Sequence, residues 1–104
     1  MQAIAIFDKI VFDNIHAKIC NSNQWKLIGM NESYITYECP KCESEFSTGE
    51  PRTPYFTGII KDTPENIQVC KDVLKELNIQ LHTIVQFTAD SEGIITEETI
   101  ITYD

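Results

Sequence analysis

The stretch YECPKCESEF, residues 37–46, holds two cysteines separated by two residues, with a proline directly after the first. Zn²⁺ takes four ligands in a tetrahedron, and two thiolates spaced in this way at a tight turn can both point at one ion. Proline fixes one backbone dihedral of such a turn in advance. Cys39 and Cys42 therefore predict half of a metal site, and its other ligands must come from elsewhere in the chain.

The remaining cysteines and histidines are Cys20, Cys70, His16 and His82. His16 and Cys20 are four positions apart in HAKIC, so they can share one ion if they lie on one turn of helix or at a bulged strand end. The segment between HAKIC and CPKC is long enough to return as a hairpin. We therefore expect one structural zinc ion in a Cys₃His site made of Cys39, Cys42, Cys20 and His16.

Cys70 lies on the apolar stripe of a predicted helix, where a free cysteine behaves as a small hydrophobic side chain. His82 falls in a predicted strand, and we expect it to be a surface or hydrogen-bonded imidazole instead of a ligand. Two other interpretations of the cysteine pair stay open: a reduced pair that binds no metal, and a working dithiol.

The dithiol is the less favoured interpretation, because Glu38, Glu43 and Glu45 surround the pair and negative neighbours disfavour a thiolate. In thioredoxin-like proteins the reactive cysteine also begins a helix, whose dipole lowers the thiol pKa. The residues that follow Cys42, ESEFSTGEP, do not form a convincing helix.

Residues 37–46 resemble the zinc knuckle of zinc-ribbon proteins, and equally the first half of a Cys/His zinc finger. In both families an aromatic residue, a spacer, the C-x-x-C pair and a second aromatic recur, as they do in YECPKCESEF. The chain departs from both patterns, because no histidine occurs between Phe46 and His82, no second C-x-x-C is present, and Glu43 stands where a knuckle usually has glycine. We expect Tyr37 and Phe46 to pack beneath the turn and shield it.

A helix over residues 64–77 is the clearest of the elements that must position these side chains. Thr63 can cap its N-terminus, Pro64 suits the first helical position, and Asn78 can end it in a left-handed conformation. Its apolar residues recur at three- and four-residue spacing, at Ile67, Cys70, Val73, Leu74 and Leu77. Residues 81–87 and 93–103, on either side of the turn TADSEG, predict a hairpin after the helix.

The N-terminal part of the chain is predicted to be mostly strand. Residues 9–19, KIVFDNIHAKI, fit a strand or a helix, and the density of Ile, Val and Phe favours the strand. The loop STGEPRTP, residues 47–54, separates this part from the helix. We predict strands at 2–7, 9–19, 24–30, 33–39, 45–48 and 58–60. The expected fold is a single α+β domain over 1–104, a mostly antiparallel sheet with one well-defined helix followed by a C-terminal hairpin.

The chain is acidic, with a net charge of −8 from 16 acids and 8 bases. The last base is Lys75, and only acids follow it: Glu76, Asp90, Glu92, Glu97, Glu98 and Asp104. Such a surface repels nucleic acid, because affinity for phosphate comes from cationic side chains. It is either a solvated, soluble face or a surface that docks on a basic protein. In the second case we expect Asp90, Glu92, Glu97 and Glu98 to bind that partner.

These features predict a small acidic, non-enzymatic interaction protein that binds and inhibits a basic, nucleic-acid-binding partner. In size and charge it resembles inhibitors encoded by phages and mobile elements, such as nucleic-acid mimics and anti-CRISPR proteins. A zinc-ribbon nucleic-acid binder, with a local basic patch in its N-terminal half, and a thiol redox protein using CPKC are the alternatives. No apolar run could span a bilayer and no signal-peptide pattern is present, so we expect a cytoplasmic protein.

Overall fold

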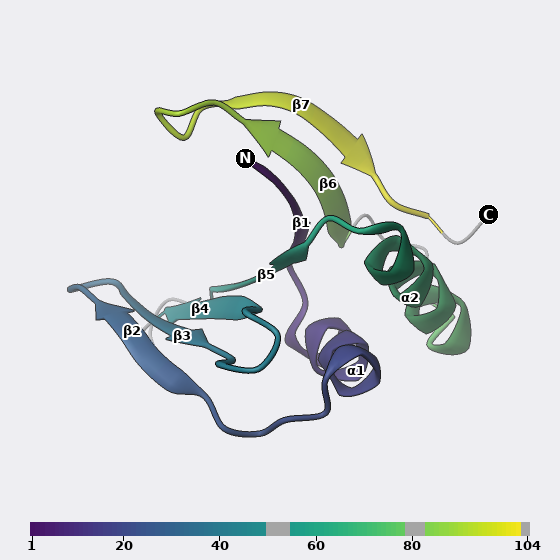
Figure 1. The fold of residues 1–104 in the computed structure, drawn as a ribbon, viewed down its shortest axis with the longest axis horizontal. Coiled ribbons are helices and arrows are strands. Elements are labelled where there is room, and N and C mark those ends of the chain that lie inside the picture. The colour runs from purple at the N-terminus through teal and green to yellow at the C-terminus, as the bar shows by residue number, and fades with distance from the viewer. Residues whose placement is uncertain (50–54, 79–82, 103–104) are drawn as a thin grey trace.

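The computed structural model of the chain describes residues 1–49, 55–78 and 83–102. In these residues the fold is α+β: one seven-stranded antiparallel sheet in the order β2-β3-β4-β5-β1-β6-β7, with two helices (Figure 1). The strands are β1 Gln2–Ile6, β2 Lys26–Met30, β3 Tyr34–Glu38, β4 Glu45–Gly49, β5 Phe56–Lys61, β6 Ile84–Ala89 and β7 Ile95–Ile100. The helices are α1 Lys9–Ile19 and α2 Pro64–Glu76.

Strand β1 lies at the centre of the core and pairs with β5 on one side and β6 on the other. Successive side chains of a strand point to opposite faces of the sheet. Ile4 and Ile6 are fully buried in the cluster that includes residues of both helices, so they face the helical layer. Ala3 and Ala5 therefore face the other side of the sheet, which no described helix covers.

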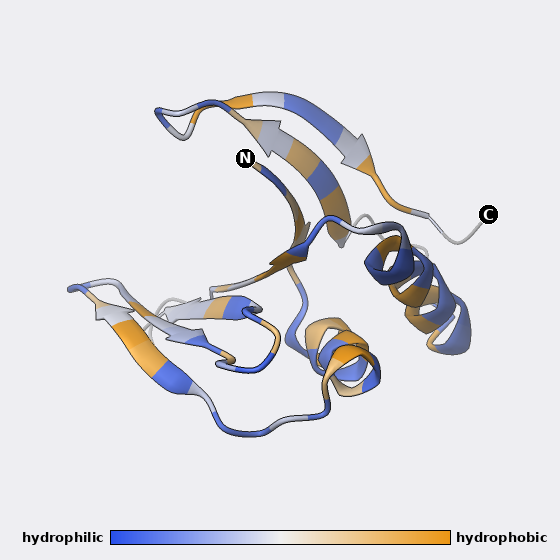
Figure 2. Cartoon of the chain, viewed as in Figure 1, coloured by the Kyte–Doolittle hydropathy of each residue, from blue (hydrophilic) through white to orange (hydrophobic). Residues whose placement is uncertain are grey.

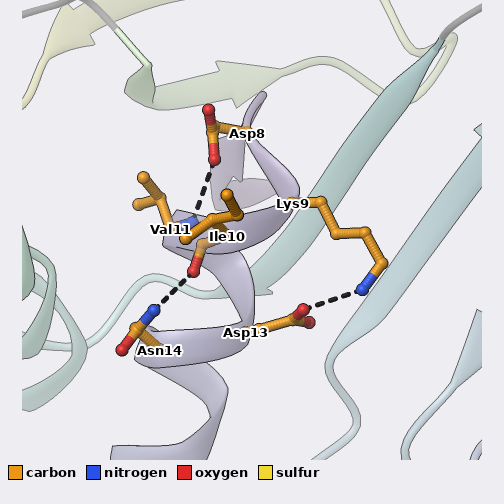
Figure 3. A network of polar contacts seen from close by, with 6 residues as sticks. All are labelled: Asp8, Lys9, Ile10, Val11, Asp13 and Asn14. Atoms are coloured by element: carbon orange, nitrogen blue, oxygen red, sulfur yellow. Dashed lines mark hydrogen bonds and ion pairs between the residues drawn. The ribbon is translucent and has the colours of Figure 1, made fainter.

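Helix α1 begins immediately after β1, at an aspartate cap (Figure 3). The Asp8 carboxylate accepts a hydrogen bond of 3.1 Å from the Val11 N–H, which satisfies one of the free donors of the first turn. Lys9 and Asp13 form an ion pair of 2.7 Å one turn apart, but both side chains are exposed, so the pair contributes only a few tenths of a kcal/mol, about 0.3–0.5.

The strand predicted over residues 9–19 is wrong, because this segment is helix α1. Val11, Phe12 and Ile15 are fully buried at three- and four-residue spacing, whereas a strand would have placed Asp13 on the same face as Val11. Burial of this stripe, together with the Asp8 cap, outweighs the modest β preference of Ile, Val and Phe. The described chain therefore has two helices instead of the single one expected.

Helix α2 confirms the predicted helix, with its C-terminal bound one residue earlier than expected. Thr63 caps it by accepting a hydrogen bond of 3.1 Å from the Asn66 N–H, and Asn78 has the left-handed φ of 53°. The hairpin after it is β6 and β7, which pair antiparallel. Leu81 and His82, at the start of the predicted strand 81–87, lie outside the described residues.

The Phe12 ring is the centre of an aromatic cluster that joins α1 to the sheet. It is fully buried, and its centroid lies 5.9 Å from that of Phe46 and 5.5 Å from that of Phe56. The ring fits closely because Gly58 on β5 has no side chain: a Cβ built there would overlap the Phe12 ring. The position of Phe12, and with it that of α1, therefore depends on a glycine far away in the sequence.

We predict that Gly58→Ala destabilises the fold by about 1–3 kcal/mol, because a packed core has no room for the extra methyl group. Urea unfolding of purified protein measures the change. Gly29→Ala is the matched control, since the nearest heavy atom there would be the Thr36 Cβ at 3.9 Å. Equal losses of stability in the two variants would contradict the dependence of α1 packing on Gly58.

Candidate metal centre

The four residues predicted as zinc ligands lie together in the structure. One ligand atom from each of His16, Cys20, Cys39 and Cys42 lies within 4.8 Å of the other three. The Cys20 and Cys39 Sγ atoms are 3.9 Å apart, and the edge of a tetrahedron with metal–sulfur bonds of about 2.3 Å is about 3.8 Å. All four cysteines are free. The cluster could hold one metal ion.

The C-terminal turn of α1 supplies two of the four side chains. His16 and Cys20 are four residues apart, so they lie one above the other on the same side of the helix. The Cys20 and Asn21 N–H groups both donate to the His16 carbonyl, at 2.9 and 3.1 Å. Asn21 then takes a left-handed φ of 54°, which ends the helix directly after the ligand pair.

The turn between β3 and β4 supplies the other two side chains, as the sequence predicted. The Cys39 N–H donates to the Ser44 carbonyl at 2.8 Å, and the Glu43 N–H donates to the Cys39 carbonyl at 2.8 Å, so the backbone closes tightly around the pair. Cys42 Sγ and Ser44 Oγ are also in contact, at 3.2 Å. These bonds point both sulfurs toward the end of α1.

Glu43 occupies the position where a zinc knuckle usually has glycine, and its φ is +60°. This left-handed conformation costs a residue with a Cβ about 1–2 kcal/mol, whereas glycine adopts it freely. The Glu43 carboxylate reaches Lys61 on β5 at 3.1 Å, an exposed ion pair that offsets little of that cost. The turn therefore places a residue with a Cβ at a position whose backbone conformation glycine would adopt at lower cost.

Aromatic rings enclose the imidazole of His16, which is 5% exposed. The Trp25 ring lies 4.7 Å from it at a tilt of 40°, and the Phe12 ring stacks on it at 6.1 Å. Its Nε2 atom is buried and has no hydrogen-bond partner among the described residues. The imidazole adjoins three thiols, so one of its ring nitrogens could serve as a metal ligand beside them.

The predicted shielding by aromatic residues is present and larger than expected. Tyr37 and Phe46 stack at 5.1 Å, and Phe46 packs edge-on against Trp25 at 4.7 Å. Phe12 and Trp25 were not among the residues predicted to shield the cysteine pair. The spacing of Phe12, His16 and Cys20, each four residues from the next, would have placed Phe12 beside the site if residues 9–19 had been taken as a helix.

The pKa values of the thiols differ strongly within the chain. Burial tends to raise the pKa of Cys39, but N–H groups of Cys42 and Lys41, together with the His16 and Cys42 side chains, outweigh it and lower that pKa to about 6. The pKa of Cys42 is raised, mainly by burial and also by the neighbouring Cys39. Burial raises the pKa of Cys70 to about 12. A thiolate is the form that binds metal, so Cys39 is prepared for that role.

The expectation that Glu38, Glu43 and Glu45 would oppose a thiolate is therefore not met at Cys39. Glu38 and Glu45 are paired residues of β3 and β4, and they point away from the face on which Phe46 packs against the core. Burial first, and then the charge of Glu38, raise the pKa of Glu45 itself. Hydrogen bonds from the backbone N–H groups of Cys42 and Lys41 and from the His16 and Cys42 side chains together outweigh the effect of burial on Cys39.

The other candidate residues lie elsewhere. Cys70 is fully buried in the core, as predicted for a hydrophobic role, and His82 lies outside the described residues. Asp90 and Glu92 are at the β6–β7 turn, where Asp90 Oδ1 accepts from the N–H groups of Glu92 and Ile94, both at 2.9 Å. Glu97 and Glu98 are exposed on β7.

Comparison of the chain with family models, with curated proteins and with solved structures found no match. Neither of the two described helices is both long and apolar enough to cross a membrane.

We predict that thiol reactivity separates Cys70 from the two partly exposed cysteines of the cluster, Cys20 and Cys42. In metal-free protein under native conditions, iodoacetamide should modify the partly exposed Cys20 and Cys42, while Cys70 stays unmodified because it is buried and its pKa is about 12. Peptide mass spectrometry locates the modified residues, and the same reaction on denatured protein gives the total number of modifiable cysteines. Early modification of Cys70 would contradict the described core.

Proposed function

We propose that this chain is a small, non-enzymatic binding protein that is stabilised by one structural zinc ion. The observation that carries the proposal is the convergence of ligand atoms from His16, Cys20, Cys39 and Cys42 to within 4.8 Å of one another. With four protein ligands no coordination position stays open for water or substrate, which is the pattern of a structural site and not of a catalytic one.

The ligand chemistry favours zinc over other divalent metals. Three soft thiolates and one imidazole in a tetrahedral arrangement suit Zn²⁺, whereas Mg²⁺ and Ca²⁺ require oxygen ligands. The ion would neutralise the charge of the clustered thiolates and give the buried imidazole a partner. It would also tie the end of α1 to the β3–β4 turn and so close the loop that contains β2 and β3.

We predict one zinc per chain in purified protein, measured by elemental analysis together with native mass spectrometry. Cys39→Ala should lose the metal and lower the free energy of unfolding by at least about 3 kcal/mol, because binding to the folded state alone stabilises it. Cys70→Ala is the matched control, since it removes a buried cysteine and leaves all four ligands in place. Zinc retained by Cys39→Ala, or absent from the unmodified chain, would contradict the proposal.

A thiol redox protein is the less favoured alternative, although the low pKa of Cys39 suits thiol chemistry. The Cys39 side chain is fully buried, so a substrate disulfide could not reach it without opening the turn. The residues after Cys42 form a turn and β4, as expected from the sequence, and not a helix whose N-terminus would activate a thiol.

The ion pairs of the N-terminal lysines argue against a nucleic-acid-binding zinc ribbon. Lys9 is paired with Asp13 at 2.7 Å and Lys18 with Glu76 at 3.1 Å, so their charge is partly neutralised. Lys26 and Lys41 are exposed, but two cations supply little of the phosphate neutralisation that binding to a nucleic acid requires. Arg52 lies outside the described residues.

The partner that we propose is a basic protein, bound by the acidic β6–β7 hairpin. The specific observation is that all six residues of β7 are exposed and that no lysine or arginine occurs between Ile84 and Ile100. Inhibition of a nucleic-acid-binding protein, of the kind that phages and mobile elements encode, fits this surface. A reducing, cytoplasmic location would keep the thiols available for the metal.

We predict salt-sensitive binding of cationic probes and none of nucleic acid. A lysine-rich peptide should bind measurably at about 50 mM salt and at least tenfold more weakly at about 300 mM, because screening shortens the reach of exposed charges. Single- and double-stranded DNA serve as anionic probes in the same titration. Binding of DNA, or of neither probe, would remove this part of the proposal.

A further inference from the structure

We propose that the free edge of β7 is the docking site, and that the partner binds by adding an extended segment with two adjacent basic residues as a further strand of the sheet. This inference rests on the proposed interaction with a basic protein, but it does not depend on the metal site. It specifies which part of the acidic surface binds the partner, namely one strand edge with a defined register.

The backbone of β7 offers unpaired hydrogen-bonding groups along one side. β7 is the last strand of the sheet, and the Ile101 N–H donates to the Ile84 carbonyl of β6 at 2.9 Å. Because N–H and C=O groups of successive residues in a strand point to alternate sides, those of Glu98 and Ile100 point away from β6. No other described strand lies there, so these groups form a template for an added strand.

The two glutamates of β7 face opposite sides of the sheet. Glu98 pairs with Phe87 and Glu97 with Thr88, and adjacent residues of a strand alternate in direction. A partner that lay flat on one face would meet only one of the two carboxylates. A strand along the edge would run beside both, so the arrangement matches two adjacent lysines or arginines, which also alternate.

The open face of the sheet next to β7 is apolar and hollowed. A trough of about 430 Å³ lies there, and its lining includes Ala5, Phe7, Val85, Phe87, Ile95 and Glu98. Ile95 and Glu98 are three residues apart and would face opposite ways in a regular strand, but the register shift at Thr88 and Ala89 brings them to one side. Apolar residues flanking the basic pair of the partner would cover this trough.

The charge pattern of β7 argues for a basic partner and against a second copy of this chain. Figure 2 shows a hydrophilic centre of β7 between hydrophobic ends. Pairing of two β7 strands about their centres, in either direction, would bring Glu97 and Glu98 next to the same residues of the other copy. Like charges directly opposite each other destabilise a strand pair, whereas opposite charges stabilise it.

The other edge of the sheet, strand β2, does not combine a free strand edge with carboxylates. Strand β2 has exposed Leu27, Ile28 and Met30, and its one charged residue is Lys26. It therefore lacks the carboxylates that would select a basic segment. Association of β2 with β7 of another molecule is a distinguishable outcome, because it would occur without any added peptide.

The test uses the full chain, labelled with ¹⁵N, and two peptides. The first is a ten-residue capped peptide with two adjacent lysines flanked by alternating valine and threonine. The second has the same sequence with N-methyl groups on alternate residues, which removes one hydrogen-bonding edge and keeps the charge. We expect the first to shift the amide signals of Glu98 and Ile100 and to slow their hydrogen exchange, and the second to bind at least tenfold more weakly.

A double variant tests the role of the carboxylates. Glu97→Gln together with Glu98→Gln should weaken binding of the first peptide about five- to tenfold at low salt. The control is Glu32→Gln with Glu65→Gln, which removes the same charge from exposed positions in the β2–β3 turn and at the start of α2. Equal weakening by the two double variants would overturn the assignment of the site to β7.

The remaining outcomes separate this inference from the function on which it rests. Equal binding of both peptides would leave the interaction function standing and overturn strand addition. Binding of neither would remove the interaction function and this inference with it. Concentration-dependent shifts on β7 without peptide would assign the edge to a second copy of the chain and overturn the basic partner.

Discussion

The contact between the last turn of α1 and the β3–β4 turn is the constraint on which the site depends. His16 and Cys20 are four residues apart, which is about 6 Å along a helix axis but about 13 Å along a strand. The helix therefore brings both side chains to the sulfurs of Cys39 and Cys42, which a regular strand would not do. The Asp8 cap, the buried stripe of α1 and the space left by Gly58 for the Phe12 ring therefore position the ligands before any ion binds.

The site was more predictable from the sequence than the element that supplies half of it. Spacing and residue type identify His16, Cys20, Cys39 and Cys42 without knowledge of the fold, because tetrahedral chemistry restricts which side chains can meet. The strands and α2 were also predictable, since caps, turns and alternation are local signals. Residues 9–19 were not, because the favourable energy of α1 comes from packing against α2, β5 and β4, which lie far away in sequence.

Charges were harder to interpret than apolar residues, for a geometric reason. Glu38 and Glu45 are close in sequence to the cysteines but face away from α1, and Glu97 and Glu98 are adjacent but face opposite sides of β7. A count of acids gives only the net charge of −8, whereas the direction of each side chain decides what the acids can meet. At the cysteine turn, burial is the largest single influence on the pKa of Cys39 and raises it, but the hydrogen bonds of backbone N–H groups and of the His16 and Cys42 side chains together outweigh burial.

We propose that three sulfurs and one imidazole nitrogen bind a single zinc ion between α1 and the β3–β4 turn. X-ray absorption at the zinc edge of the purified chain measures the ligand shell directly. The account predicts a four-coordinate ion with three sulfur atoms at about 2.3 Å and one nitrogen at about 2.0–2.1 Å. A shell of oxygen and nitrogen without sulfur, or one with only the two sulfurs of the CPKC turn, would contradict it.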